Sequence, residues 1–352
     1  MRKLLPLLLL FSFTSLTYGE DLKSSVVSES AELLSCFSGK RECSSFLDIP
    51  WDKPSFQFWR AYYRNRWNRL KLISQVDNFK LYYPLVVKIF REEGLPPDLA
   101  LLAIVESNGE PWAVSKAGAA GLWQLMPGTA RRLGLRVTGY IDERFDIEKS
   151  TRAAARYLKE LYGRFKRWDL AIAAYNAGPG RIEDRLRKLG ADEFWDLTKL
   201  PDETLNYVPR FYAVLSLVHE KGLLKRPSRE RLVKIKVTTR TSLYRISRKL
   251  RVPFRKLYLY NRQFKRKIVP AGYFVYVPQR VIRNFAVLRY SRKSRIYLYS
   301  PKRAERITRI ARAFGVSPTF IKKVNGLKRN IVYRGEAVII VKAEKGEVNT
   351  NG

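Results

Sequence analysis

The feature that most constrains the fold is an apolar helical run, residues 99–105, that ends in the carboxylate Glu106. Pro-Pro-Asp precedes the run and is typical of a helix start, while the Ser-Asn-Gly that follows Glu106 favours a turn. The apolar wall beside Glu106 disfavours its ionised form and raises its pKa toward values at which it donates a proton near neutral pH. Taken alone, a glutamate at a helix end is more often solvated or ion-paired, so the downstream motifs decide between these interpretations.

The chain length of 352 residues favours two or three domains, because single hydrophobic cores stop growing at about 250–300 residues. Aromatic and apolar residues recur at helical spacing over residues 55–90, which predicts amphipathic helices. Further helices are predicted from Pro127 to an end at Gly134, over residues 153–165 with a start at Ser150, and over residues 170–176. No strand alternation stands out in this central region, which we expect to be α-rich.

The N-terminus has the pattern of a secretory signal. It begins with Met-Arg-Lys, continues with an apolar stretch over residues 4–16, and reaches Gly19, after which we expect cleavage. An uncleaved anchor is the alternative, although the stretch is shorter than the roughly 20 residues that span a bilayer. We therefore expect an exported protein of the periplasm or cell envelope, either free or membrane-associated.

The two cysteines, Cys36 and Cys43, lie close together in the exported region and predict a small disulfide loop, with free thiols as the alternative. Neither cysteine has a partner cluster of metal-ligating residues. The single histidine, His219, lies in an apolar helical stretch and is expected to pack rather than to catalyse. The sequence therefore predicts neither a metal nor a cofactor.

The net charge of +36 is concentrated in the C-terminal third. Residues 221–352 carry 36 Lys and Arg against 5 Asp and Glu, whereas residues 1–220 carry 32 against 27. A segment this basic is attracted to polyanions such as nucleic acid, anionic lipid or anionic cell-wall polymer. Export argues against nucleic acid, and a solvated surface that serves stability is the plainer alternative.

The basic third contains two copies of one pattern at an offset of 64 residues. Apolar residues and a closing asparagine of the first copy fall on counterparts in the second: Ile246, Leu250, Val252, Leu257 and Asn261 on Ile310, Phe314, Val316, Ile321 and Asn325. A strand-like alternation over residues 232–237 opens the first copy, and each copy ends in a glycine turn and an apolar strand. We expect each repeat to be strand, helix, helix, strand.

Four ordered motifs in residues 85–222 resemble those of lytic murein transglycosylases with a goose-lysozyme-like catalytic domain, most closely the membrane-bound D type. The motifs are Glu106-Ser107, Gly121-Leu122-Trp123-Gln124, Ala174-Tyr175-Asn176-Ala177-Gly178 and Glu203-Thr204-Leu205-Asn206-Tyr207-Val208. The resemblance implies a mostly α, lysozyme-like fold that cleaves peptidoglycan. Trp123 replaces the methionine common in the wider superfamily but suits the D type.

The two basic repeats resemble LysM modules, which bind glycans that contain N-acetylglucosamine. Their usual Gly-Asp-Thr opening turn is replaced by Thr239-Arg240-Thr241 in the first copy and Arg303-Ala304-Glu305 in the second. We therefore expect a signal at residues 1–19, a lead-in with a helical segment at 20–84, the catalytic domain at 85–222, and LysM-like modules at 230–280 and 294–343.

Glycosidic cleavage needs a proton for the leaving oxygen and a group that meets the oxocarbenium charge, and Glu106 is the candidate donor. A hydrolase would add a second carboxylate about 5 to 9.5 Å away. Glu110, Asp142 and Asp146 are candidates by proximity, although each is more often a solvated or capping acid. The resemblance implies that the substrate's N-acetyl group and C6 hydroxyl act instead, giving a 1,6-anhydromuramoyl product with Glu106 as both acid and base.

The resemblance also implies the substrate-binding residues. Ser107 and Gln124 are expected near the N-acetyl and sugar groups, Tyr175 and Asn176 on a helix end that turns sharply, and Tyr207 beside the glutamate. Structural roles are the alternatives, with Asn176 capping its helix and Tyr207 packing in the core.

The leading hypothesis is a lytic transglycosylase that acts on peptidoglycan strands, and we expect it to be a monomer. A hydrolytic muramidase and a non-catalytic peptidoglycan-binding protein are the alternatives. The basic C-terminal region is expected to hold anionic wall polymer or a membrane surface, and no nucleic acid is expected as partner.

Overall fold

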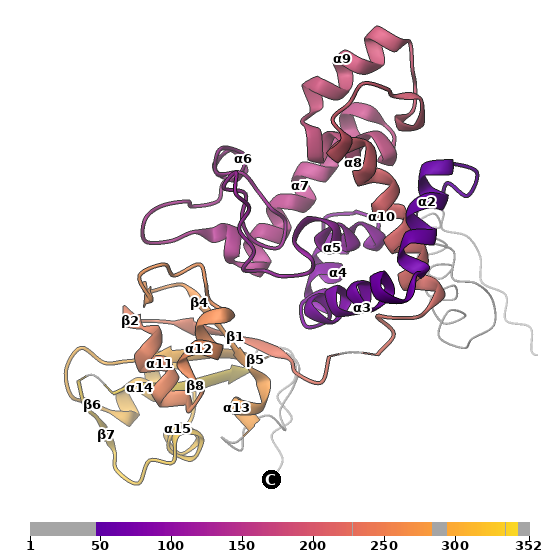
Figure 1. Ribbon diagram of the computed structural model, residues 1–352. Helices are drawn as coiled ribbons and strands as arrows, with labels where there is room; N and C mark the ends of the chain where they lie inside the picture. Colours follow the sequence, from indigo (N-terminus) through magenta and orange to yellow (C-terminus); the bar gives the residue numbers. More distant parts are fainter. Residues whose placement is uncertain (1–46, 227, 284–293, 335, 344–352) are drawn as a thin grey trace, which may run out of the picture. The chain divides into compact units, whose positions relative to one another are not determined.

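The structure is a computed structural model that describes residues 47–226, 228–283, 294–334 and 336–343 (Figure 1). The predicted signal peptide and the predicted Cys36–Cys43 disulfide lie outside these residues. None of the described helices is long and apolar enough to cross a membrane.

The first part of the described chain is helical, as expected for a mostly α domain. Its elements are α2 (Pro54–Arg64), α3 (Arg66–Lys80), α4 (Tyr83–Glu92), η1 (Pro97–Leu101), α5 (Leu102–Ser107), α6 (Pro127–Arg132), η2 (Glu143–Phe145), α7 (Ile147–Phe165), α8 (Trp168–Ala177), α9 (Pro179–Leu189), η3 (Phe194–Asp196) and α10 (Asp202–Glu220).

Local signals explain most of these boundaries. Pro127 occupies the first turn of α6, and Gly134 follows its end with a φ of +84°, as the sequence predicts. Helix α7 begins at Ile147, earlier than the predicted Ser150, because the side chain of Asp146 accepts a hydrogen bond from the Lys149 amide and caps the helix. The apolar run starts as a 3-10 turn before it becomes α5.

The run that carries Glu106 is the centre of the helical core. Its residues 99–105 are all buried, and α5 packs between α3 and α10. Helix α10 also packs along α2 and α8, so that it brings a distant part of the chain against the end of α5. Burial of this run stabilises the fold by about 25 cal/mol per Å² of apolar surface removed from water. The same packing holds in place the helix end that carries Glu106.

The C-terminal part contains the strand, helix, helix, strand order expected for each repeat, with further short strands beside the helices and a short helix after the first repeat. The elements are β1 (Leu232–Val237), β2 (Thr241–Ser242), α11 (Leu243–Leu250), α12 (Phe254–Leu259), β3 (Ile268–Val269), β4 (Phe274–Pro278), α13 (Gln279–Arg283), β5 (Ser294–Tyr299), β6 (Glu305–Arg306), α14 (Ile307–Phe314), α15 (Pro318–Asn325), β7 (Ile331–Val332) and β8 (Val338–Ala343).

The two repeats share one four-stranded sheet, which the sequence did not predict. The strand order is β4-β1-β5-β8, with antiparallel pairs within each repeat and a parallel pair, β1 with β5, between them (Figure 1). Leu298 of β5 lies opposite Val237 of β1, and both are buried in the same hydrophobic cluster. The second repeat therefore supplies part of the core of the first.

The closing asparagines confirm the alignment of the repeats in atomic detail. The Asn261 side chain donates to the carbonyls of Leu257 and Tyr276 and accepts from the Tyr276 amide. Asn325 makes the equivalent three bonds with Ile321 and Ile339. In each repeat one side-chain amide, buried in the first copy and half-buried in the second, thus joins the second helix to the closing strand, because it satisfies backbone groups that neither element pairs by itself.

Candidate active site

Glu106 lies in the last turn of α5, where α10 delivers the hydroxyl of Tyr207 to its carboxyl. Tyr207 donates a short hydrogen bond to Glu106 Oε1, across 101 residues of sequence. Burial raises the pKa of Glu106 from its ordinary 4.5 to about 7. The bond from Tyr207 and the charge of Arg210 lower this pKa, and the charge of Glu203 raises it, but burial outweighs them. Glu106 can therefore be protonated near neutral pH.

Tyr207 remains a donor throughout the physiological range. Burial, followed by the negative charge of Glu106, raises the pKa of its phenol well above 10. The hydroxyl is thus held protonated beside the carboxyl, and it favours the ionised carboxylate by hydrogen bonding to it. One contact therefore both orients Glu106 and moderates the effect of its burial.

The turn formed by residues 121–124 packs against the same helix end. The buried hydroxyl of Ser107 lies 2.9 Å from the carbonyl oxygens of both Ala103 and Leu122, so it ties α5 to this turn. A Cβ on Gly121 would lie 2.0 Å from the Arg144 carbonyl oxygen, and its φ is +82°. Only glycine fits both the conformation and the contact.

Gln124 ends this turn in a left-handed conformation, with φ +43°. Its amide nitrogen donates to the carbonyl oxygens of Ala113 and Gly121, at 3.2 and 2.8 Å. The side chain is half-buried and held by its own loop. The structure therefore brings the predicted Gln124 and Ser107 into one assembly with Glu106, while their contact with sugar stays a prediction.

Tyr175 of α8 supports the turn from the other side. Its hydroxyl donates to the carbonyl oxygen of Trp123 at 2.9 Å, and the charge of Glu106 contributes to raising its pKa well above 10, after burial. Trp123 is fully buried, stacks on Phe90, and donates from its indole nitrogen to Thr151. The tryptophan is thus a packing residue that fixes the backbone to which Tyr175 bonds.

Asn176 follows on the same helix but bonds to α10. Its amide nitrogen lies 3.4 Å from Glu203 Oε1, and its amide oxygen accepts from Thr204 Oγ1 at 2.8 Å. These contacts join two of the predicted motifs. They also place the negative charge of Glu203 where it raises the pKa of Glu106.

The three acids that sequence proximity suggested do not share one environment. Asp142 is fully buried and pairs with Arg144 and Lys265, and Asp146 caps α7. Glu110 is half-buried and lies four residues after Glu106, beyond the end of α5. Among the described acids, Glu203 is the one whose charge acts on the pKa of Glu106.

Arg210 is a site residue that the sequence interpretation missed. Its charge lowers the pKa of Glu106, and its guanidinium lies 5.3 Å from the centre of the Trp59 ring. Trp59 in turn donates to Asn206 at 3.0 Å. Its spacing from Tyr207 could have indicated it in the sequence, because residues 207 and 210 are three apart and share one face of a helix.

In the described part of the chain no group of three metal-ligating side chains is present. His219, near the end of α10, lies 3.1 Å from the buried carboxyl of Asp98. The described site therefore consists of carboxyl, phenol, hydroxyl, amide, guanidinium and backbone groups.

Comparison with known proteins matches three segments to families. Residues 88–198 match the transglycosylase SLT domain, residues 231–291 the LysM-like domain of the lytic transglycosylase MltD, and residues 302–340 the LysM domain. The SLT match ends before α10, so Tyr207 lies beyond it.

Two of the similar proteins are named as transglycosylases. Membrane-bound lytic murein transglycosylase D of Escherichia coli strain K12 is 40% identical over 133 residues, which are 36% of this chain and 29% of that protein. Peptidoglycan transglycosylase gp16 of Escherichia phage T7 is 39% identical over 112 residues, covering 31% and 8%. The chain thus spans less than a third of the length of these relatives.

Among solved structures, an inactive mutant of the lytic transglycosylase Slt from Pseudomonas aeruginosa is 29% identical, with a TM-score of 0.34 over 40% of this chain and 24% of that one. The chain carries a transglycosylase SLT domain, followed by a LysM-like domain of the MltD type and a LysM domain.

Proposed function

We propose that this chain is a peptidoglycan lytic transglycosylase that cleaves the β-1,4 bond between N-acetylmuramic acid and N-acetylglucosamine, with Glu106 as its acid and base. The observation that carries the proposal is the environment of Glu106. Burial raises its pKa to about 7, and Tyr207 holds it by a hydrogen bond. The SLT match and the 40% identity to lytic murein transglycosylase D support the same chemistry.

In the first step Glu106 donates its proton to the glycosidic oxygen as the bond from that oxygen to C1 of the muramoyl residue breaks. A pKa near 7 suits this step, because a substantial fraction of the carboxyl is protonated at neutral pH. The substrate's N-acetyl group stabilises the positive charge that develops at C1.

In the second step the ionised Glu106 accepts the proton of the C6 hydroxyl as that oxygen bonds to C1. The ring closes to the 1,6-anhydromuramoyl product and the acid is regenerated, with no water consumed. Tyr207 supports both states, since its hydroxyl bonds to the ionised carboxylate and keeps the side chain in place. One carboxyl thus suffices for both proton transfers.

The basic repeats fit the same substrate. The matches to LysM families support binding to peptidoglycan glycan, and the excess of Lys and Arg in residues 221–352 supports attraction to an anionic envelope surface. We place the protein in the cell envelope, where its substrate lies.

Product analysis tests the proposal. Uncrosslinked glycan strands incubated with the protein should yield muropeptides with anhydro ends, each one water lighter than a hydrolysis product in the mass spectrum. Glu106→Gln should abolish both products. Reducing-end products would instead identify a muramidase.

Retention of peptidoglycan without cleavage at any pH would identify a binding protein. Glu183→Gln is a matched control, because its side chain is 41% exposed and its carboxyl pairs with Arg164.

A further inference from the structure

The first repeat, residues 230–280, contacts the helical domain at a segment next to the turn of residues 121–124, which we call the active-site turn. This segment, residues 136–146, is named the docking loop. Its Ile141 forms an antiparallel bridge with Phe264, the Asp142 amide donates to the carbonyl oxygen of Gln263, and the Lys265 amide donates to the carbonyl oxygen of Tyr140. The loop thus pairs with the repeat as a short strand would, through backbone bonds that hold its register.

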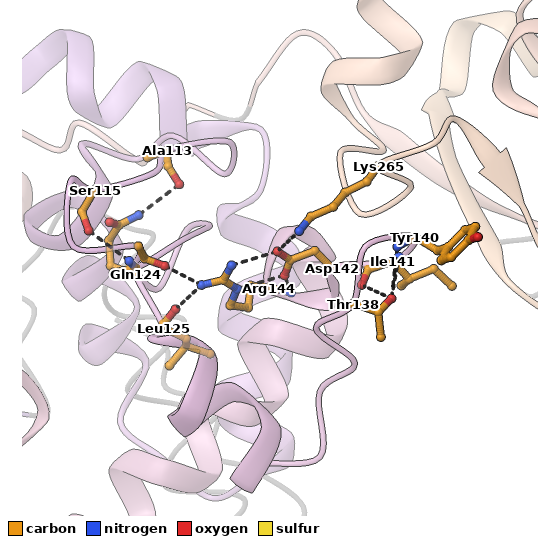
Figure 2. Close-up of polar contacts among 12 residues, drawn as sticks. Ala113, Ser115, Gln124, Leu125, Thr138, Tyr140, Ile141, Asp142, Arg144 and Lys265 are labelled. Atoms are coloured by element: carbon orange, nitrogen blue, oxygen red, sulfur yellow. Dashed lines mark hydrogen bonds and ion pairs between the residues drawn. The ribbon is translucent and has the colours of Figure 1, made fainter.

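Side chains reinforce this backbone pairing. Lys265 Nζ lies 3.2 Å from Asp142 Oδ2, and the Asp142 side chain is only 1% exposed (Figure 2). Tyr273 donates to Glu143 at 3.1 Å, and Tyr276 donates to Asp146 at 3.3 Å. All three acids of the docking loop therefore have partners from the first repeat.

Arg144 connects Asp142 to the active-site turn. The guanidinium makes two bonds to the Asp142 carboxylate, at 2.9 and 2.8 Å (Figure 2). Its remaining nitrogen donates to the carbonyl oxygens of Gly118 and Leu125, at 2.7 and 3.0 Å. These two carbonyls flank the turn that carries Gln124.

The backbone of Arg144 touches the same turn. Its carbonyl oxygen occupies the space that a side chain on Gly121 would need. Ser107 then connects the turn to α5 beside Glu106. A continuous set of contacts therefore runs from Lys265 through Asp142 and Arg144 to the turn and to the catalytic helix end.

Asp142 is the centre of this set. Burial acts to raise the pKa of its carboxyl, but the bonds from Arg144 and then Lys265 outweigh it and hold the pKa below its usual range. Without Lys265 this buried carboxylate would keep Arg144 as a partner but lose part of the positive charge that compensates it. The arrangement of Arg144 therefore depends on how fully Asp142 is paired.

From this geometry we infer that the first repeat positions the active-site turn, and that Lys265 is the positioning residue through which it does so. The inference rests on the proposed function, because it concerns the rate of that reaction. It gives the repeat a second role beside the glycan binding of its family. In this role the repeat acts on the catalytic step even when the substrate is too short to reach any glycan site on the repeat.

Charge reversal at Lys265 tests the inference in the full chain. Lys265→Glu places a carboxylate beside Asp142, and Lys236→Glu makes the same charge change on an exposed strand position of the same repeat. Any loss from weaker attraction to a polyanion affects both variants. We expect kcat on soluble, uncrosslinked glycan strands to fall about tenfold further in Lys265→Glu than in Lys236→Glu, with KM within about twofold.

Lys265→Arg retains the positive charge and should restore most of kcat. Hydrogen exchange supplies a readout that does not need activity: amides of residues 118–125 should exchange faster in Lys265→Glu than in Lys236→Glu. If Lys265→Glu does not fold, Lys265→Met is compared with Lys236→Met by the same criteria.

Equal kcat and equal exchange in the two charge-reversed variants would overturn the inference. A parent protein that cleaves no glycan would overturn the proposed function instead, and the exchange comparison would then decide the positioning role by itself.

Discussion

The contact between Glu106 and Tyr207 helps to set the pH at which Glu106 loses its proton. The Tyr207 bond lowers the pKa of Glu106, while burial holds it at about 7. Removing the hydroxyl in Tyr207→Phe should therefore raise this pKa further. Because the reaction needs protonated Glu106, kcat/KM of the parent should fall as pH rises through about 7, and this alkaline limb should move to higher pH in the variant.

Tyr175→Phe is the matched control for that measurement. Its hydroxyl donates to the Trp123 carbonyl and not to Glu106. Both variants should lose rate through disturbed geometry, but only Tyr207→Phe should displace the limb of the pH profile. An unmoved limb in Tyr207→Phe would show that the hydrogen bond does not control the titration.

Burial of Glu106 should also cost stability at alkaline pH. Below pH 4.5 the carboxyl is protonated in the folded and unfolded states, so it contributes nothing there. Between about 4.5 and 7 the unfolded chain ionises first, which destabilises the folded state by an amount that is complete above pH 7. In full this shift represents about 3 kcal/mol, and partial exposure of the side chain reduces it.

Glu106→Gln removes that cost. Its Tm should exceed that of the parent by more at pH 8 than at pH 5, measured by thermal unfolding in buffers of equal ionic strength. A gain of the same size at both pH values would contradict a raised pKa at Glu106.

At the scale of elements, the active-site turn depends on a close approach that only Gly121 permits. Gly121→Ala would place a methyl group 2.0 Å from the Arg144 carbonyl oxygen, so the turn or the docking loop must move. Overpacking of this kind costs about 1–3 kcal/mol. We expect a lower Tm and a loss of kcat larger than the loss of stability explains.

Gly118→Ala separates this contact from backbone strain. Gly118 also has a positive φ, +88°, but a Cβ there meets no atom within 4 Å. The two variants therefore share the conformational penalty and differ in the clash. Similar kcat in both would mean that the approach to Arg144 does not matter for the site.

The elements themselves were largely predictable, because their signals are local. Pro127 and Gly134 bound α6 as expected, and the apolar pattern with its closing asparagine predicted the repeat from the sequence. The start of α7 was predicted at Ser150 and lies at Ile147, because Asp146, for which capping was only one of the roles considered, caps the helix. The meeting of Glu106 with Tyr207 could be expected only from the family resemblance, because no local pattern relates residues 101 positions apart.

At the scale of the whole molecule, the missed features are contacts between distant segments. Nothing in the alternation of β1 specifies that β5 will lie beside it, and the docking loop has no strand pattern that would predict its pairing with Phe264. Both contacts depend on backbone groups, which every residue carries, so side-chain patterns do not reveal them. The sequence accordingly predicted two separate modules where the structure has one shared sheet.

The shared sheet predicts that the two repeats lose structure together. Leu298 of the second repeat is buried in the core of the first, so Leu298→Ala should cost about 2–5 kcal/mol and accelerate hydrogen exchange in β4. Ile310 lies in the second repeat's own cluster, and Ile310→Ala should accelerate exchange mainly in α14 and α15. Unchanged exchange of β4 in Leu298→Ala would mean that the repeats are independent. Faster exchange in β4 would instead mean that a loss of structure in the second repeat also destabilises the first. Through Lys265 it would then affect the docking loop as well.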